Sequence, residues 1–216
     1  MEARGVLKLL VFDCDGVLFD SREANRAYYN AICEAMGRPP LSEEELEVVH
    51  MQTAENSVRY LFRNQPELID KALEFQKSLN YEKFIHLMKP EPGLEELVKS
   101  IRPPVKTAIS TNRTTTMGRL LEIFNYEPFF DLVVTALVSP KPKPHPEALK
   151  MILDHFRVTP KEVLYVGDTE VDYKLTKALN VPLVAFKNPN LEADFHVKSF
   201  YELQNLIKET FLLRGV

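Results

Sequence analysis

The chain has 216 residues, of which 45% are apolar and 27% charged, as expected of a globular protein with a sizeable core. Its net charge of −4 argues against a nucleic-acid partner, because a phosphate backbone requires a basic surface. No apolar stretch reaches the ~18 residues that a membrane span needs, and no signal-peptide pattern is found. We therefore expect a cytoplasmic protein without a membrane partner.

Residues 7–15 contain the first predicted element, a short apolar run that ends in two acids. The run predicts a strand that is buried on both faces, and Gly16 supplies the turn after it. Asp13 and Asp15 then lie at the carboxyl end of a buried strand, where open α/β sheets bind ligands. Two carboxylates at one strand end repel each other and favour a cation, although they can also cap a turn. Cys14 is interpreted as a packing residue.

Residues 21–88 show helical periodicity instead of strand patterns. Ser21 is a candidate N-cap for a first helix. Ser42 and Glu45 have the spacing of a capping box and predict the start of a second helix. Further helices are predicted near 54–63 and 67–87, and a linker at 89–93. The pattern indicates an all-helical insertion of about seventy residues.

The rest of the chain alternates between strands and helices. The predicted helices are 93–100, 114–124, 145–156, 170–179 and 199–213, and the predicted strands are 105–111, 132–135, 163–166 and 182–186. Such alternation implies right-handed crossovers and a parallel sheet with helices on both faces. We therefore predict an α/β fold in which 1–20 and 89–216 form the core domain and 21–88 an inserted helical cap.

Polar residues follow four of the predicted strands. Because parallel strands place their carboxyl ends at one edge of the sheet, these residues are expected to meet there: Asp13, Asp15, Ser110, Thr111, Asn112, Arg113, Lys141, Lys143, Asp168 and Asp172. So many acids in one place require a bound cation and a positive side chain. Hard oxygen ligands suit Mg²⁺, which keeps waters and shares substrate phosphate.

Each of these segments also has a simpler explanation. Residues 110–112 could cap the following helix, the proline-rich segment 139–146 could be a stiff linker, and 167–168 could form an ordinary turn. His145 is more consistent with a surface residue than with a ligand. Four polar strand ends in this order are improbable by chance, and their conjunction favours a functional site.

The same residues resemble the motifs of a known family. The segment Asp13-Cys-Asp-Gly-Val-Leu-Phe-Asp-Ser21 is similar to the first motif of the haloacid dehalogenase (HAD) superfamily. Thr111 matches the second motif, Lys143 the third, and the segment from Gly167 to Asp172 the fourth. Lys143 is preferred to Lys141 because the pattern Lys-Pro-x-Pro-Asp/Glu continues only from Lys143. The resemblance covers nearly the whole chain and implies a Rossmann-like core with a helical cap.

The resemblance implies a phosphatase that uses two carboxylates in different roles. Asp13 would be the nucleophile that forms an aspartyl-phosphate, which splits a very slow hydrolysis into two steps. Asp15 would protonate the leaving alcohol and then activate water, so its pKa is expected to be raised. Mg²⁺ would bind Asp13, the backbone carbonyl of Asp15 and Asp168, with Asp172 supporting the site.

The remaining motif residues would act on the phosphoryl group, and the cap would close over the site. Lys143 would neutralise the nucleophile and the transferring group. Thr111, Asn112 and Arg113 are predicted to bind the substrate, the first two through its phosphate oxygens.

The motifs also separate subclasses of the family. Dehalogenases lack the second acid, so Asp15 favours phosphoryl chemistry. Asn25 stands where similar sugar-phosphate mutases have a histidine, which disfavours a mutase, and the stretch 111–113 resembles phosphoglycolate phosphatases. The expected partner is a small phosphorylated metabolite: phosphoglycolate, a sugar phosphate, pyrophosphate or a nucleoside monophosphate.

A catalytically inactive binding or regulatory module is the alternative from another class. It is disfavoured because no motif residue is replaced. The oligomeric state stays open. Candidate substrate contacts in the cap, each of which a solvated helix face also explains, are Arg22, Asn25, Arg26, Arg59 and Arg63.

Overall fold

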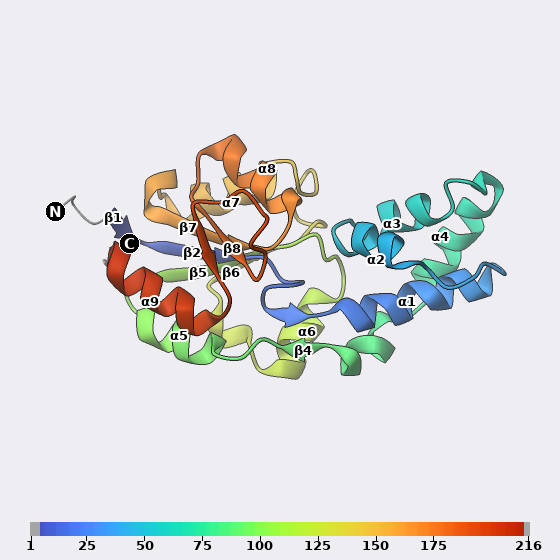
Figure 1. The fold of residues 1–216 in the computed structure, drawn as a ribbon, viewed down its shortest axis with the longest axis horizontal. Helices are drawn as coiled ribbons and strands as arrows, with labels where there is room; N and C mark the ends of the chain where they lie inside the picture. Colours follow the sequence, from blue (N-terminus) through green and yellow to red (C-terminus); the bar gives the residue numbers. More distant parts are fainter. Residues whose placement is uncertain (1–4, 214–216) are drawn as a thin grey trace.

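The protein is described by a computed structural model covering residues 5–213, in which an α/β core lies beside a helical cap (Figure 1). The main sheet has six parallel strands in the order β6-β5-β2-β7-β8-β9. These strands are β2 (Leu9–Phe12), β5 (Lys106–Ser110), β6 (Leu132–Val134), β7 (Val163–Gly167), β8 (Leu183–Phe186) and β9 (Phe195–Val197). The parallel α/β core predicted from the alternating pattern is confirmed.

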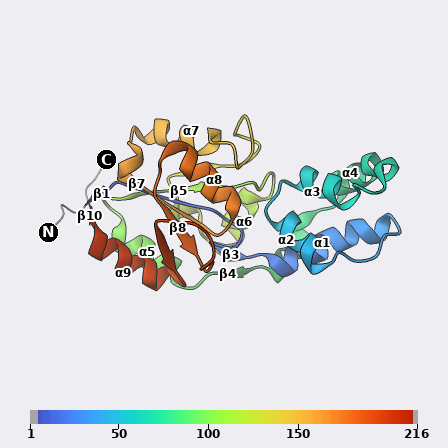
Figure 2. The same cartoon turned by 45° about the horizontal axis from the view of Figure 1, so that its top comes forward.

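Helices cover both faces of this sheet (Figure 2). One face packs against α5 (Leu94–Ile101), α6 (Met117–Phe124) and α9 (Phe200–Thr210), and the other against α7 (Glu147–Phe156) and α8 (Glu170–Leu179). Strand β2 explains why both faces must be covered. Leu10 and Phe12 belong to the first apolar cluster, whereas Leu9 and Val11 belong to the second. Its uninterrupted apolar run therefore follows from burial on two sides.

The cap consists of α1 (Arg22–Ala35), α2 (Glu43–His50), α3 (Ala54–Leu61) and α4 (Ile69–Ser78), which share an apolar cluster of their own. The capping box of Ser42 and Glu45 is confirmed at the start of α2. Ser21 does precede α1, but its side chain makes no capping hydrogen bond, so that part of the prediction is wrong. No helix within residues 5–213 is long and apolar enough to cross a membrane.

The chain enters and leaves the cap through two short paired segments. Strand β3 (Phe19–Asp20) pairs antiparallel with β4 (Lys89–Pro90), so the predicted linker begins as a strand. The predicted helix 67–87 is interrupted, because Leu79 adopts an extended backbone and Asn80 caps a new turn at Glu82. Helix α4 is therefore flanked by 3-10 helices at Pro66–Leu68 and Tyr81–Leu87.

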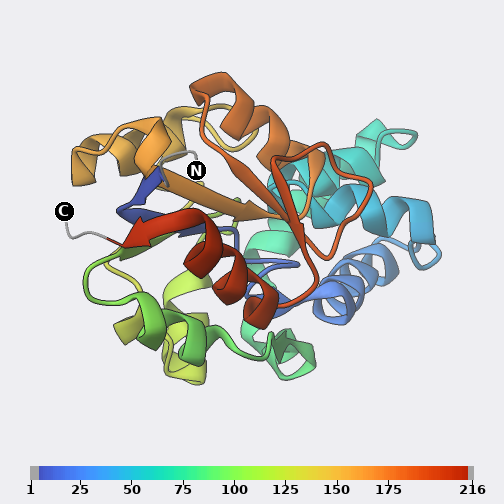
Figure 3. The same ribbon diagram turned by 60° about the vertical axis from the view of Figure 1, so that its left-hand side comes forward.

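The carboxyl-terminal part of the chain differs from the prediction in two places. The last helix ends at Thr210, and β10 (Phe211–Leu213) pairs in parallel with β1 (Gly5–Leu7), blue and red in Figure 3. Strand β9 adds a sixth strand to the main sheet. Strands β9 and β10 each have three residues, and so short a segment has no clear periodicity of its own.

Candidate active site

The functional side chains gather at the carboxyl ends of the three central strands. Strand β2 lies between β5 and β7, so the sheet extends from β2 in both directions. Asp13 follows β2, Thr111 follows β5 and Asp168 follows β7. The crevice at such a switch point is where open α/β sheets bind ligands. The structure thus brings together the strand ends as predicted.

Three carboxylates form a compact cluster at this edge. Asp13, Asp168 and Asp172 offer oxygen atoms that all lie within 4.8 Å of one another. Burial, reinforced by the charges of Asp172 and Asp13, raises the pKa of Asp168 well above its usual value. The buried Oδ1 of Asp168 has no hydrogen-bond partner among the described residues. An oxygen-only set with an unpartnered carboxylate oxygen fits a hard divalent cation such as Mg²⁺.

Two glycines make room for this cluster. Gly16 has a φ of +79°, and a Cβ there would lie 2.0 Å from Oδ2 of Asp168. A Cβ at Gly167 would lie 2.5 Å from the Cβ of Asp172. Carbon and oxygen atoms cannot approach so closely, so glycine at both positions is required by the position of the acids.

Lys143 lies among the acids, as the third motif predicts. Its Nζ is 2.9 Å from Oδ1 of Asp13 and 2.8 Å from Oδ1 of Asp172, and its side chain is only 3% exposed. Burial lowers the pKa of Lys143, but the two carboxylates outweigh it and hold the pKa well above its usual value. The side chain of Lys141 is 59% exposed. The choice of Lys143 over Lys141 therefore agrees with the geometry.

Asp13 has an unusual charge balance. Burial raises its pKa, Lys143 lowers it and Asp172 raises it again, with a net value of about 7. The backbone N–H of Cys14 donates to Oδ1 of Asp13 at 2.6 Å, and the Cys14 side chain is buried as predicted. The carboxylate of the nucleophile candidate thus accepts from a backbone N–H and from a lysine that it shares with Asp172.

Tyr165 is a site residue that sequence reasoning missed. Its hydroxyl lies 3.3 Å from Nζ of Lys143, 3.1 Å from Oδ1 of Asp172 and 3.2 Å from the carbonyl oxygen of Ser110. A tyrosine in an otherwise aliphatic strand, two residues before Gly167, was the available signal. The hydroxyl restrains the lysine and the acid together.

The two residues after β5 hold the loops of the site in place. The amide of Asn112 accepts from the backbone N–H of Lys143 at 2.8 Å and donates to its carbonyl at 3.1 Å. The hydroxyl of Thr111 accepts from the backbone N–H of Arg113 at 3.1 Å, and Thr111 is buried. Asn112 thereby positions Lys143. Phosphate binding by Thr111 and Asn112 stays a prediction.

Asp15 forms a two-pronged ion pair with Arg113. Nε and Nη2 of Arg113 lie 2.8 and 2.7 Å from the two carboxylate oxygens. Burial raises the pKa of Asp15, but the charge and hydrogen bonds of Arg113 outweigh it and the net pKa is lowered. The expectation of a raised pKa is wrong for this arrangement, because sequence reasoning did not pair the two residues.

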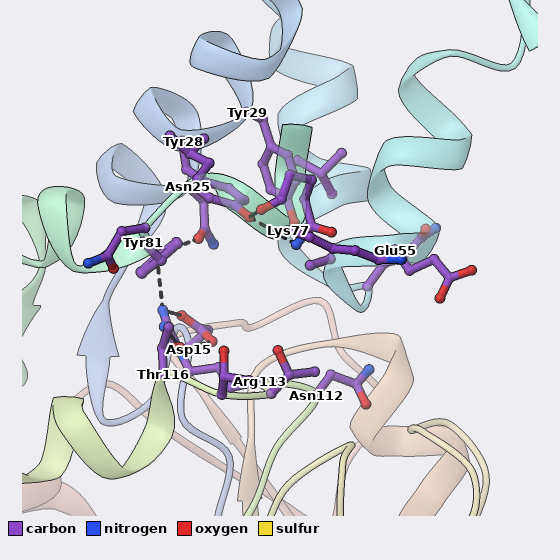
Figure 4. A pocket seen from close by; sticks show the side chains of 18 of the residues that line it. Asp15, Asn25, Tyr28, Tyr29, Glu55, Lys77, Tyr81, Asn112, Arg113 and Thr116 are labelled. Atoms are coloured by element: carbon purple, nitrogen blue, oxygen red, sulfur yellow. Dashed lines mark hydrogen bonds and ion pairs between the residues drawn. The ribbon is translucent and has the colours of Figure 1, made fainter. Parts of the chain in front are cut away.

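Hydrogen bonds continue from Arg113 into the cap (Figure 4). Nη2 of Arg113 donates to the hydroxyl of Tyr81 at 3.1 Å, and that hydroxyl donates to Oδ1 of Asn25 at 2.7 Å. Nδ2 of Asn25 lies 2.9 Å from Nδ1 of His50. A single chain of contacts therefore joins Asp15 to helices α1 and α2. Tyr81 and His50 were missed, since no local pattern marks them.

A cavity of about 550 Å³ lies between the core and the cap, lined by Asp15 and Arg113 from the core and by Asn25 and Tyr81 from the cap side (Figure 4). The four arginine candidates in the cap do not line it. They form ion pairs with glutamates instead, as a solvated helix face predicts: Arg22, Arg26, Arg59 and Arg63. His145 is exposed, as predicted.

Comparison with known proteins gives the class of the chain. Residues 10–186 match the family model of haloacid dehalogenase-like hydrolases, and the chain therefore belongs to this family. A solved HAD-superfamily hydrolase of subfamily IA, variant 1, from Geobacter sulfurreducens is 37% identical, with a TM-score of 0.81 over 93% of this chain and all of that one. The helical cap region, α1–α4, is part of this shared architecture.

Curated relatives are more distant. A phosphorylated carbohydrates phosphatase from Thermotoga maritima is 28% identical over 181 residues, which cover 81% of this chain and 82% of the relative. A phosphoglycolate phosphatase from Pseudomonas putida is 29% identical over 189 residues, covering 82% and 68%. A β-phosphoglucomutase structure from Clostridium difficile has a TM-score of 0.83 at 19% identity, which shows the shared fold alone.

Proposed function

We propose that this chain is a Mg²⁺-dependent phosphatase that hydrolyses a small phosphomonoester through an aspartyl-phosphate on Asp13. The observation that supports it most is the arrangement around Asp13. Its carboxylate lies 2.9 Å from Nζ of Lys143 and shares a cluster with Asp168 and Asp172, while Asp15 lies two residues further on, beside the cavity. A nucleophile, a cation site and a separate acid are the parts that this chemistry requires.

Each residue has a defined part in the proposed reaction. A divalent cation held by Asp13, Asp168 and the backbone carbonyl of Asp15 would neutralise charge on the phosphoryl oxygens. An Asp13 oxygen attacks phosphorus, and the bond between phosphorus and the ester oxygen breaks. In its protonated form Asp15 gives a proton to the departing alkoxide, and its anion then takes one from the water that attacks the aspartyl-phosphate. Because Arg113 lowers the pKa of Asp15 in the free site, that proton has to be taken up as the substrate binds.

The surroundings of the two acids support different roles for them. Lys143 counters the charge of Asp13 and of the transferring group at once, which lets an anionic phosphate approach an anionic carboxylate. Asp172 holds Lys143 at 2.8 Å and caps the start of α8 through Thr169. Asp15 faces the cavity, where the leaving group must lie.

The substrate is proposed to be a small molecule, because the site opens into a cavity that the cap covers. The names of the relatives offer two classes, phosphoglycolate and phosphorylated carbohydrates. A mutase is not proposed, because Asn25 replaces the histidine that similar mutases have. Every motif residue is present, so an inactive module is not proposed either.

Hydrolysis of small phosphomonoesters with and without Mg²⁺ tests the proposal. We expect phosphate release from an aryl phosphate in Mg²⁺, loss of activity in excess chelator and its return on adding Mg²⁺. Asp168→Asn should weaken the apparent Mg²⁺ affinity more than substrate binding at saturating metal. Full activity in chelator, or turnover of a phosphoprotein with small esters untouched, would contradict the proposal.

A further inference from the structure

The cavity between core and cap differs in character from the phosphoryl end of the site. It measures about 550 Å³, and twelve of its twenty lining residues are uncharged amides, hydroxyls or phenols, among them Gln52, Gln76 and Tyr28. Four lining residues are charged and four are apolar. A wall of this kind offers hydrogen bonds to hydroxyl groups and aromatic faces to carbon atoms, without supplying net charge.

The charges that line the cavity already have partners or lie at its rim. Arg113 is bonded to Asp15 through two donors, its Nη2 also reaches Tyr81, and its Nη1 reaches the hydroxyl of Thr116 at 3.2 Å. Its side chain is 7% exposed. All three guanidinium nitrogens of Arg113 therefore already have hydrogen-bond partners, so Arg113 is not available to bind a substrate anion.

The other cation of the lining is Lys77, which is exposed. Lys77 and Glu55 project from the cap helices, across the cavity from Arg113 (Figure 4). A carboxylate next to the scissile bond would lie near Asp15 and would have no free cation beside it among the described lining residues. Such a buried, unpaired charge is strongly unfavourable.

The volume of the cavity also favours a polyhydroxylated alcohol over glycolate as the leaving group. Glycolate has five non-hydrogen atoms, which correspond to roughly 150 Å³ at the ~30 Å³ that a water molecule occupies in the liquid. A hexitol has twelve, or roughly 360 Å³ on the same scale. A cavity of about 550 Å³ accommodates the larger alcohol together with a few waters and leaves most of its wall unused by the smaller acid.

We propose that the leaving group is an uncharged, polyhydroxylated alcohol, so that the substrate class is sugar and polyol phosphates and not phosphorylated hydroxy acids. The inference rests on the proposed phosphatase function. In this arrangement Arg113 is a positioning residue that holds Asp15 toward the leaving group, and the neutral wall of the cap recognises the hydroxyls.

Matched substrate pairs test the inference on the unmodified protein with Mg²⁺. Sorbitol 6-phosphate and 6-phosphogluconate differ only in a terminal hydroxymethyl or carboxylate group, as do glycerol 3-phosphate and 3-phosphoglycerate. We expect kcat/KM to favour the neutral member of each pair by at least about tenfold. An equal rate, or a preference for the acid, would overturn the inference while leaving the phosphatase proposal intact. Failure to hydrolyse any ester, an aryl phosphate included, would overturn both.

Arg113→Lys separates positioning from substrate recognition. As a positioning residue, Arg113 should affect both members of a pair by the same factor, and alkyl esters more than an aryl ester, whose leaving group needs less protonation. A loss confined to the acid member would make Arg113 the receptor of a carboxylate and would overturn the inference.

Gln52→Leu tests the neutral wall directly, because it removes hydrogen bonding at nearly constant volume. We expect kcat/KM for sorbitol 6-phosphate to fall by about 3–10-fold, the value of one hydrogen bond, with the aryl phosphate changed by less than about twofold. Gln65→Leu, at an exposed cap position outside the cavity lining, is the matched control. An equal loss on both substrates, or no loss on either, would contradict recognition by this wall.

Discussion

The two sides of the site are built in different ways. On the phosphoryl side, Asp13 and Asp172 both contact Lys143 at the carboxyl edge of the sheet, within a buried core. On the leaving-group side, the hydrogen bonds of the cap residues Tyr81 and Asn25 reach the core through Arg113. The first side is fixed by strand geometry and defines the reaction, whereas the second depends on where the cap lies and defines which alcohol fits.

The same difference appears in the two acids of the first motif. Asp13 shares Lys143 with Asp172, and burial leaves its pKa raised to about 7. Burial also raises the pKa of Asp15, but Arg113 pairs with this carboxylate and outweighs the effect, so its pKa is lowered. The pKa values of the two aspartates thus shift in opposite directions, because Lys143 is shared between Asp13 and Asp172 whereas Arg113 pairs with Asp15 alone.

Removing the nucleophile should have the largest effect and would show that the core side carries the chemistry. Asp13→Asn cannot form the covalent intermediate, so we expect turnover to fall by about 10⁴-fold or more with the fold retained. Steady-state phosphate release and a thermal melt measure both. Asp154→Asn, an exposed acid on α7, is the control and should leave turnover unchanged. A near-normal rate in Asp13→Asn would contradict the assignment.

Asp15→Asn should have the next largest effect, about 10²–10⁴-fold, because proton transfer is lost while the nucleophile remains. In a single-turnover experiment the burst should be more defective for an alkyl phosphate than for an aryl phosphate. Hydrolysis of the intermediate also needs a base, so the contrast belongs to the first turnover. Equal burst defects for the two esters would refute the acid role.

Lys143→Gln should lower turnover by about 10²–10³-fold, because the charge that links Asp13 to Asp172 is removed. Two acids then face each other unpaired, and stability at pH 7 should fall by about 3–5 kcal/mol in urea unfolding. Lys141→Gln changes the neighbouring, exposed lysine and should alter neither quantity measurably. A larger effect at Lys141 would transfer the third motif to that residue.

The two lysines also illustrate which site residues can be predicted from the sequence. Lys143 was identifiable because its contacts follow from a strand end and a local motif, and the same holds for Asp13 and Asp168. Tyr81 and His50 join the site through cap packing, which no local pattern encodes. The ion pair of Asp15 with Arg113 joins residues 98 positions apart, and it reversed the expected pKa shift.

The strands show the same difference between local patterns, which can be predicted, and long-range contacts, which cannot. Strand β2 was predictable because burial on both faces leaves an uninterrupted apolar run. Strands β1 and β10 were not, because three residues at each end of the chain become strands only by pairing with each other. The break after α4 was missed because Leu79 is apolar and continues the helical period, although its backbone is extended.

Gly16→Ala would test the tight approach of backbone and acid at the core side. The added Cβ would lie 2.0 Å from Oδ2 of Asp168 at a φ of +79°, so we expect a loss of about 1–3 kcal/mol and a weaker apparent Mg²⁺ affinity. Gly37→Ala also has a positive φ, +70°, but open space around it. It should cost about 1 kcal/mol and leave the Mg²⁺ dependence unchanged. Equal Mg²⁺ effects in the two variants would contradict the steric explanation.

The remaining expected effect, which does not involve catalysis, is a pH dependence of stability in the absence of metal. The pKa of Asp13 is raised from 3.8 to about 7 by folding, so the folded state binds more protons between these values. The contribution of Asp13 to stability should therefore be largest at acid pH and be lost as pH rises toward 7, by at most ~1.4 kcal/mol per unit for one proton. Urea midpoints at pH 5 and 7.5 in chelator measure this. Asp13→Asn should flatten the profile, and an unchanged slope would argue against Asp13 as its source.

Chemical identification of the covalent intermediate tests the nucleophilic role of Asp13 most directly. A rapid-quench turnover of an aryl phosphate in Mg²⁺, followed by borohydride reduction, converts an aspartyl-phosphate into homoserine at the modified position. We expect homoserine at residue 13 in peptide mass spectra, with none at residue 15, and none at either position without substrate. Modification at another acid, or continued turnover with no reducible intermediate on the enzyme at any quench time, would contradict an aspartyl-phosphate on Asp13.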